Sequence, residues 1–332
     1  MLFTLAALGV GVWAVVSRRD ELAGATSYLK HIHADWIIIA VVAEAIAVIS
    51  FAVLQQRLLR AGRVGLRLPI LTAITLGGNA IQSSFPGGVA WSAVWSYRQF
   101  RHRGADELLS GWTLLATTIL SQMTLVVLAA VGLLLAGSQG SSLDLVGAII
   151  GLFVTAALIV VMWRERAVLI RAAARALRVW QRFTHEPKGD ATELVNGWAS
   201  RLSAFSPSRE DWAFASLMAL ANWVWDCTAL AAAFLAVGAH VPWRGLILAY
   251  GAAQLAANLP ITPGGLGVVE GSLTVALVAY GGAEASTVAA VLLYRLIAFW
   301  ALLPVGWASW GYVTTRTRRT MLVRVAFEEA AP

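Results

Sequence analysis

Long apolar runs are the feature of this sequence that most constrains its fold. Six segments are long enough to cross a bilayer, which takes about 20 residues as a helix and fewer at a chain end; they are residues 2–16, 36–54, 108–136, 143–163, 212–237 and 285–313. Only 13% of the residues are charged, against about 25% in soluble domains. Because residues 2–16 lack a basic start and a cleavage site, we interpret them as a retained span rather than a signal peptide. The sequence therefore predicts an all-α polytopic membrane protein with six full transmembrane helices.

Two further apolar segments, residues 69–100 and 245–280, are interrupted near their middle by SSFPGG and ITPGG. Each half has about 15 residues, or roughly 22 Å of helix, which is too short for a full crossing. We therefore predict that both segments are re-entrant helical hairpins.

The distribution of basic residues tests this topology. If both hairpins return to the side that they entered, twenty of the 25 Lys and Arg residues face one side, four face the other, and Arg295 lies within a span. Such a bias is typical of the cytoplasmic face. We therefore expect a multi-pass protein of the cytoplasmic (inner) membrane, with both termini in the cytoplasm.

The two broken segments also resemble each other at an offset of 177 residues. The pairs are Pro86-Gly87-Gly88 with Pro263-Gly264-Gly265, Gly104 with Gly281, and Glu107 with Glu284; with two residues inserted, Asn79 also matches Asn258. By the charge distribution, the two hairpins enter from opposite faces. Broken helices that enter from opposite faces are typical of inverted-repeat transporters. The sequence thus predicts an inverted repeat within a single transmembrane domain, residues 1–332.

A basic linker, residues 164–210, connects the two halves. Its arginines fall on one helical face and its apolar residues on the opposite face. This pattern is typical of an interfacial helix on anionic cytoplasmic lipid. A solvated helix between the two halves would show the same separation of basic and apolar residues, so both interpretations stay open.

The break in the second hairpin has the composition of a turn at membrane depth. Pro263 precedes three glycines, Gly264, Gly265 and Gly267, which allow a sharp turn and a new helix start. The first amides of a helix have no partner within it, and hydrocarbon offers none. An anionic group would satisfy these amides and would favour the positive end of the helix dipole. We therefore expect an anion site here and a similar one after Pro86.

Four ionisable residues lie within the apolar segments: Glu44, Asp226, Glu270 and Arg295. A charge at the bilayer centre costs about 2.5–3.5 kcal/mol on insertion scales, so each should face protein or a water-filled cavity. Arg295 could pair with Glu270 or bind a phosphate, whereas a fixed ion pair would only brace the hairpin. Asp226 lies beside Asn222, which suits either helix packing or proton transfer. Glu270, Asp226 and Glu44 are candidates for proton coupling.

Enzymatic and cofactor motifs are not found. The sequence has no G-x-S-x-G, Walker loop or H-E-x-x-H, and its one cysteine, Cys227, lies in an apolar segment. We expect no metal, no cofactor and no nucleic-acid partner, and the charge of +7 is explained by the cytoplasmic face.

The stretch NLPITPGGLGVVEG, with the earlier N…FPGG…YR, resembles the membrane region of lysylphosphatidylglycerol synthases of the multiple peptide resistance factor type. The likeness extends over most of the chain. It implies lipid movement across the bilayer and adds Pro260 to the matched positions. Because the chain ends at Pro332, we expect a stand-alone member without the aminoacyltransferase domain. The first hairpin lacks an acidic residue at the place of Glu270, which argues against a symmetric mechanism.

We therefore expect a flippase-like lipid translocator that moves an anionic phospholipid or lipid-linked phosphate by alternating access. The alternatives are a membrane enzyme that modifies a lipid headgroup and a scaffold for envelope assembly. Membrane lipids would bind the basic face, and the sequence leaves a homodimer open. The expected substrate-binding residues are Asn79, Pro86, Gly87, Gly88, Arg98, Asn258, Pro263, Gly264, Gly265, Gly267, Glu270 and Arg295.

Overall fold

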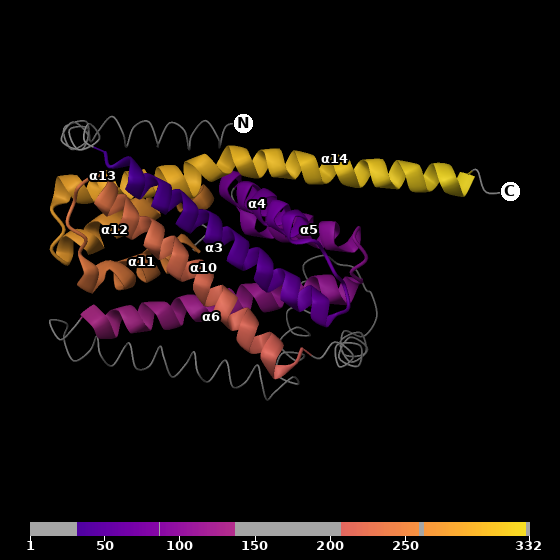
Figure 1. The fold of residues 1–332 in the computed structure, drawn as a ribbon, viewed down its shortest axis with the longest axis horizontal. Coiled ribbons are helices and arrows are strands. Elements are labelled where there is room, and N and C mark those ends of the chain that lie inside the picture. Colours follow the sequence, from indigo (N-terminus) through magenta and orange to yellow (C-terminus); the bar gives the residue numbers. More distant parts are fainter. Residues whose placement is uncertain (1–31, 86, 137–206, 259–261, 330–332) are drawn as a thin grey trace, which may run out of the picture.

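The computed structural model describes residues 32–85, 87–136, 207–258 and 262–329, with side chains up to Thr317, and these ranges fold into helices without strands (Figure 1). In chain order the helices are α3 (Ala34–Ala61), α4 (Leu68–Ser84), α5 (Gly88–Arg101), α6 (Glu107–Ala136), α10 (Arg209–Ala236), α11 (Trp243–Ala257), η2 (Pro263–Gly265), α12 (Val268–Ala279), α13 (Glu284–Arg295), η3 (Leu296–Ala301) and α14 (Leu302–Glu329).

Within the described residues, four helical stretches are long and apolar enough to cross a membrane: α3, α6, α10 and the continuous stretch Glu284–Thr317. They match four of the six predicted spans, whereas segments 2–16 and 143–163, and the linker up to residue 206, lie outside the described residues. Large apolar side chains on these helices face outward, among them Ile38, Leu115 and Leu217. Such a surface suits hydrocarbon rather than water. The chain is a multi-pass membrane protein.

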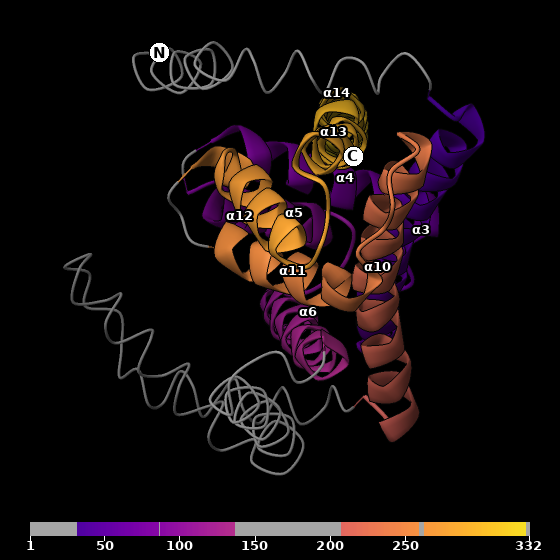
Figure 2. The same cartoon turned by 90° about the vertical axis from the view of Figure 1, so that its left-hand side faces the viewer.

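The core is built around the antiparallel pair α3 and α10, which lie together along one flank in Figure 2. Small residues such as Ala40, Ala43, Ala229 and Ala233 are fully or almost fully buried in this core, and small side chains allow helices to approach closely. The amide of His33, before α3, donates to the carbonyl of Ala236 at the end of α10. At the opposite end of the pair, Arg57 Nε lies 2.6 Å from Asp211 Oδ1.

Both interrupted segments fold back on themselves as helical pairs, α4 with α5 and α11 with α12. The open end of the first pair lies at the end of the bundle where α3 finishes, because Gly62 there packs against Leu109 at the start of α6. The open end of the second pair lies where α10 finishes, and Gly245 there packs against Tyr280. The two pairs therefore project from opposite ends of the α3–α10 pair (Figure 1).

The backbone turns of the two pairs match at the predicted offset of 177. Gly87 and Gly264 have φ of 65° and 60°, and Gly104 and Gly281 both have φ of 96°. At the tips, the amide of Gly88 donates to Phe85 and that of Gly265 donates to Thr262. At the far ends, the corresponding bonds are Ala105 to Phe100 and Gly282 to Leu277. The sequence similarity thus coincides with a similarity in local geometry.

The order and packing of the helices match as well. α3 and α10 each have 28 residues. The first helix of each pair packs against a span of the other half, α4 against α14 and α11 against α6 (Figure 2). Close contacts at glycines hold each of these helix pairs together. Gly306 of α14 lies against the Leu76 carbonyl of α4, and Gly251 of α11 lies against Ala129 of α6. The two halves are therefore interlocked rather than placed side by side.

Candidate functional site

The second tip is a short glycine turn between α11 and α12. Gly264, Gly265 and Gly267 have φ of 60°, 68° and 80°, a backbone region that favours glycine. A Cβ atom on Gly264 would overlap the ring of Phe299. The predicted need for glycine at this turn therefore has both a conformational and a steric cause at Gly264.

Glu270 caps the helix that begins after this turn. The amide of Gly267 donates to Glu270 Oε2 over 2.7 Å. A carboxylate at a helix N-terminus satisfies an unpaired amide and suits the positive end of the helix dipole. An anionic group thus occupies the predicted anion site, but it belongs to the chain itself.

Arg295 holds the other oxygen of the same carboxylate. Its Nε lies 2.6 Å from Glu270 Oε1, its Nη2 donates to the Gly264 carbonyl over 3.2 Å, and its guanidinium carbon lies 4.4 Å from the centre of the Phe299 ring. The Arg295 side chain is 9% exposed and that of Glu270 is 22% exposed. One arginine therefore fixes the turn, the cap and the following span together.

A π-helical segment follows directly after Arg295, at η3 (Leu296–Ala301). π-Helical segments are rare in proteins, and those that occur often lie at functional sites. Phe299, which contacts both Arg295 and Gly264, lies within it. The segment lies at the site without having been predicted from the sequence.

The two hairpin tips contact each other. η2 packs against α4, and a Cβ on Gly264 would lie 3.3 Å from the Cα of Ser83. The first tip also needs glycine, because a Cβ on Gly88 would overlap the Gln82 carbonyl. Next to it, Trp307 Nε1 donates to Ser84 Oγ over 3.2 Å. Pro86 and Pro260 lie outside the described residues.

The remaining predicted substrate residues lie apart from the Glu270–Arg295 pair. Asn258, at the end of α11, bonds to Gln122 and to the Gln254 carbonyl. Asn79 is exposed on α4. Arg98 is exposed near the far end of α5, about 15 Å of helix away from the tip. The structure therefore does not bring Arg98 to the hairpin tips.

A second polar cluster surrounds Asp226 between α3, α10, α11 and α13. Both Tyr250 and Tyr294 donate to its carboxylate over 2.7 Å, and Gln254 donates over 3.3 Å. Glu44 lies opposite Asp226 in the antiparallel α3–α10 pair. The tyrosines and Gln254 were not predicted, although Tyr250 and Gln254 are polar residues at i, i+4 spacing in an apolar run.

Asn222, one turn before Asp226 on α10, does not bond to Asp226. Its side-chain amide donates to the carbonyl of Ala47 on α3 instead. This bond joins α3 to α10, so Asn222 is a helix-packing residue. Within the described ranges, no three His, Cys, Asp or Glu side chains are grouped as a metal site.

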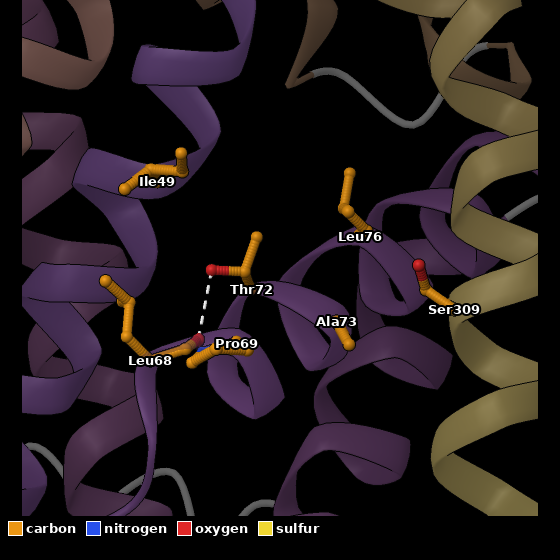
Figure 3. Close-up of a pocket in the computed structure, with 7 residues that line it drawn as sticks. All are labelled: Ile49, Leu68, Pro69, Thr72, Ala73, Leu76 and Ser309. Atoms are coloured by element: carbon orange, nitrogen blue, oxygen red, sulfur yellow. Dashed lines mark hydrogen bonds between the residues drawn. The ribbon is translucent and has the colours of Figure 1, made fainter.

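A groove of about 410 Å³ opens between α3, α4 and α14 (Figure 3). Its walls are mostly apolar: Ile49, Leu68, Pro69, Thr72, Ala73, Leu76 and Ser309. The Thr72 hydroxyl donates to the Leu68 carbonyl, so that polar group has a partner in its own helix. None of the predicted site residues lines this groove.

Comparison with known proteins places this architecture in a family. Residues 2–306 match the family described as lysylphosphatidylglycerol synthase TM region. A UPF0104 membrane protein of Methanothermobacter thermautotrophicus is 26% identical over 178 residues, which cover 49% of this chain and 50% of that protein. The chain thus spans about half the length of this curated relative in the match. With a match over nearly its whole length and the helical architecture above, the chain belongs to the lysylphosphatidylglycerol synthase transmembrane-region family.

Proposed function

We propose that the protein translocates an anionic phospholipid or lipid-linked phosphate across the cytoplasmic membrane by alternating access. One observation carries the proposal: in a protein with several apolar helices long enough to cross a membrane, two broken-helix tips contact each other beside the Glu270–Arg295 pair. Broken helices that meet near the middle of a membrane are characteristic of transporters, and intramembrane charges mark their substrate paths.

An inverted repeat with re-entrant hairpins accounts for the arrangement of the helices. The matched turns, the antiparallel α3 and α10, and the interlocked packing of α4 and α11 support it. The basic residues Arg63, Arg67 and Arg101 cluster at the end where the first hairpin opens, which supports a cytoplasmic location for that end. In this topology the protein has six full spans and both termini in the cytoplasm.

The contacts of Glu270 suggest how an anionic headgroup binds. Its carboxylate accepts from a helix N-terminal amide and from a guanidinium group, and both donors also suit phosphate. A substrate phosphate brings the same sign of charge and more acceptor oxygens than a carboxylate. Glu270 then acts as an internal anion that the headgroup displaces from Gly267 and Arg295 during transport.

The groove in Figure 3 supports a lipid rather than a small soluble anion as substrate. It is open, mostly apolar and formed by the first hairpin and two spans. An acyl chain can lie in such a groove with its methylene groups out of water. The headgroup would bind between the hairpin tips, and the acyl chains would lie in apolar grooves. The whole lipid would then move from one leaflet to the other.

Reconstituted vesicles test the proposal. The purified protein is placed in vesicles that contain phosphatidylglycerol or phosphatidylcholine with a fluorescent acyl chain, and an impermeant quencher reports which leaflet holds the probe. Faster exchange of phosphatidylglycerol than in protein-free vesicles is expected, with a smaller effect on phosphatidylcholine. No acceleration of any anionic lipid would overturn the proposal. Mass spectrometry of the recovered lipid separates movement from chemistry, since a modified headgroup would indicate a membrane enzyme.

A further inference from the structure

Two carboxyl groups face each other across the interface between the two halves of the molecule. Glu44 belongs to α3 and is 7% exposed, and Asp226 belongs to α10, the antiparallel partner of α3. The contacts His33–Ala236 and Asn222–Ala47 bracket the two residues in this antiparallel pair, so their carboxyl groups lie opposite each other. Neither residue takes part in the Glu270–Arg295 pair.

Contact between the two carboxyl groups requires a proton. An ionised carboxylate only accepts hydrogen bonds, so two carboxyl groups can bond to each other only if one of them carries a hydrogen. The oxygens of Asp226 already accept from Tyr250, Tyr294 and Gln254, which favours the ionised form of Asp226. Glu44 Oε2 is buried and no donor from another described residue faces it. The proton therefore belongs on Glu44, which donates to Asp226.

The groups around the pair do not replace that proton. Facing it from the packed helices are Cys227 on α10, Tyr250 on α11, and Tyr294 and Arg295 on α13. Arg295 is the one cation among these described groups, and its nearest carboxylate is Glu270. Loss of the shared proton would change the charge of the pair from −1 to −2 and would place two carboxylates against each other. Neighbouring like charges repel strongly in a buried site.

We propose that the Glu44–Asp226 pair is a proton-binding site and that the proton controls the packing of the two halves. The inference rests on the proposed function for its consequence: proton release to water opens the α3–α10 interface, and proton uptake closes it. The cluster also reaches the second hairpin, because Gln254 bonds to both Asp226 and Tyr294 and its carbonyl accepts from Asn258. Proton binding is therefore linked to α11, the first helix of the second hairpin.

Infrared spectroscopy of the purified protein tests the site without any transport. A protonated carboxyl group has a C=O stretch distinct from that of carboxylates, and H–D exchange shifts it. At neutral pH we expect this band in the wild type and in Glu270→Gln, where the removed side chain pairs with Arg295 and lies outside the Glu44–Asp226 pair. Glu44→Gln should lose the band, because the introduced side-chain amide donates to Asp226 in place of the carboxyl proton. Absence of the band from the wild type, or its persistence in Glu44→Gln, would overturn the site.

The second arm measures lipid exchange in vesicles with and without a pH gradient. The wild type should respond to the gradient at least several-fold, and Glu44→Gln should give the same rate in both conditions. An active wild type with no response to the gradient would contradict the coupling and leave the proton site standing. A wild type that moves no lipid would contradict the proposed function, while the infrared result would still decide the proton site.

Discussion

Arg295 Nε and Glu270 Oε1 lie 2.6 Å apart, although the two residues are 25 positions apart in the chain and belong to different helices. The same guanidinium group bonds to the Gly264 carbonyl, and the same carboxylate caps α12 at Gly267. A single ion pair thus holds the turn of the second hairpin against the span that follows it.

The stability of single and double variants should show this coupling. Glu270→Gln and Arg295→Gln each leave one buried partner without its counter-charge, and each should lower the free energy of unfolding by on the order of 3 kcal/mol. The double variant should recover most of that loss, because no uncompensated charge remains. Thermal melting in detergent measures the three variants. The exposed pair Arg101–Glu107 is the control, since Glu107→Gln should cost at most about 1 kcal/mol. Additive losses in the double variant would contradict the coupling.

Glycine substitutions at the second hairpin should differ according to their surroundings. Gly264→Ala places a Cβ against Phe299 at φ of 60° and should destabilise by more than about 1–2 kcal/mol, the cost of the left-handed backbone alone. Gly271→Ala is the matched control, because its Cβ meets nothing within 4 Å and Gly271 lies within α12. Because alanine favours a helix more than glycine does, that variant should melt at the wild-type temperature or above it. Equal melting temperatures for the two variants would contradict the tight turn.

Cysteine labelling tests the membrane topology. In a Cys227→Ala background, His102→Cys and Ala283→Cys place single thiols at exposed positions after the first and second helical pairs. An impermeant maleimide on intact cells should label Ala283→Cys, whereas His102→Cys should label only after the membrane is opened. Labelling of both from the same side would contradict the inverted repeat and transport by alternating access.

The tyrosines around Asp226 should each contribute to stability. Tyr250→Phe and Tyr294→Phe remove one donor to a carboxylate, and hydrogen bonds to charged groups contribute about 1.5–3 kcal/mol. Each variant should therefore melt at a clearly lower temperature than the wild type. Tyr280→Phe, at the partly exposed end of α12, should melt like the wild type. Wild-type melting of the first two variants would show that these bonds do not stabilise the fold.

Local patterns were sufficient to predict much of this architecture. The lengths of the apolar segments predicted α3, α6, α10 and the α13–α14 span. The Pro-Gly-Gly sequences predicted the turns of both helical pairs. The cost of isolated charges in an apolar segment indicated a partner for Arg295, but it left both Glu270 and a bound phosphate as candidates. The cap of α12 by Glu270 was also accessible, because Gly267 and Glu270 have the i, i+3 spacing of a capping residue.

Tertiary packing decided what the sequence did not predict. The contact of Gly264 with Ser83 depends on how two distant hairpins pass each other, and no local spacing encodes it. Arg98 was selected from a motif, but the direction of α5 carries it away from the tips. The bonds of Tyr250 and Tyr294 to Asp226 likewise join three helices. The π-helical turn after Arg295 has no sequence pattern that separates it from a regular helix.

In the proposed mechanism, the anion-binding groups beside the hairpin tips hold the lipid headgroup during transport. The most direct test is the rate of transbilayer phosphatidylglycerol exchange in vesicles that contain the Glu270→Gln, Arg295→Gln double variant, compared with wild type at equal protein density. The double variant should be folded, because the charges are removed together, and exchange should fall to the rate of protein-free vesicles. A folded double variant that exchanges phosphatidylglycerol at the wild-type rate would contradict the mechanism.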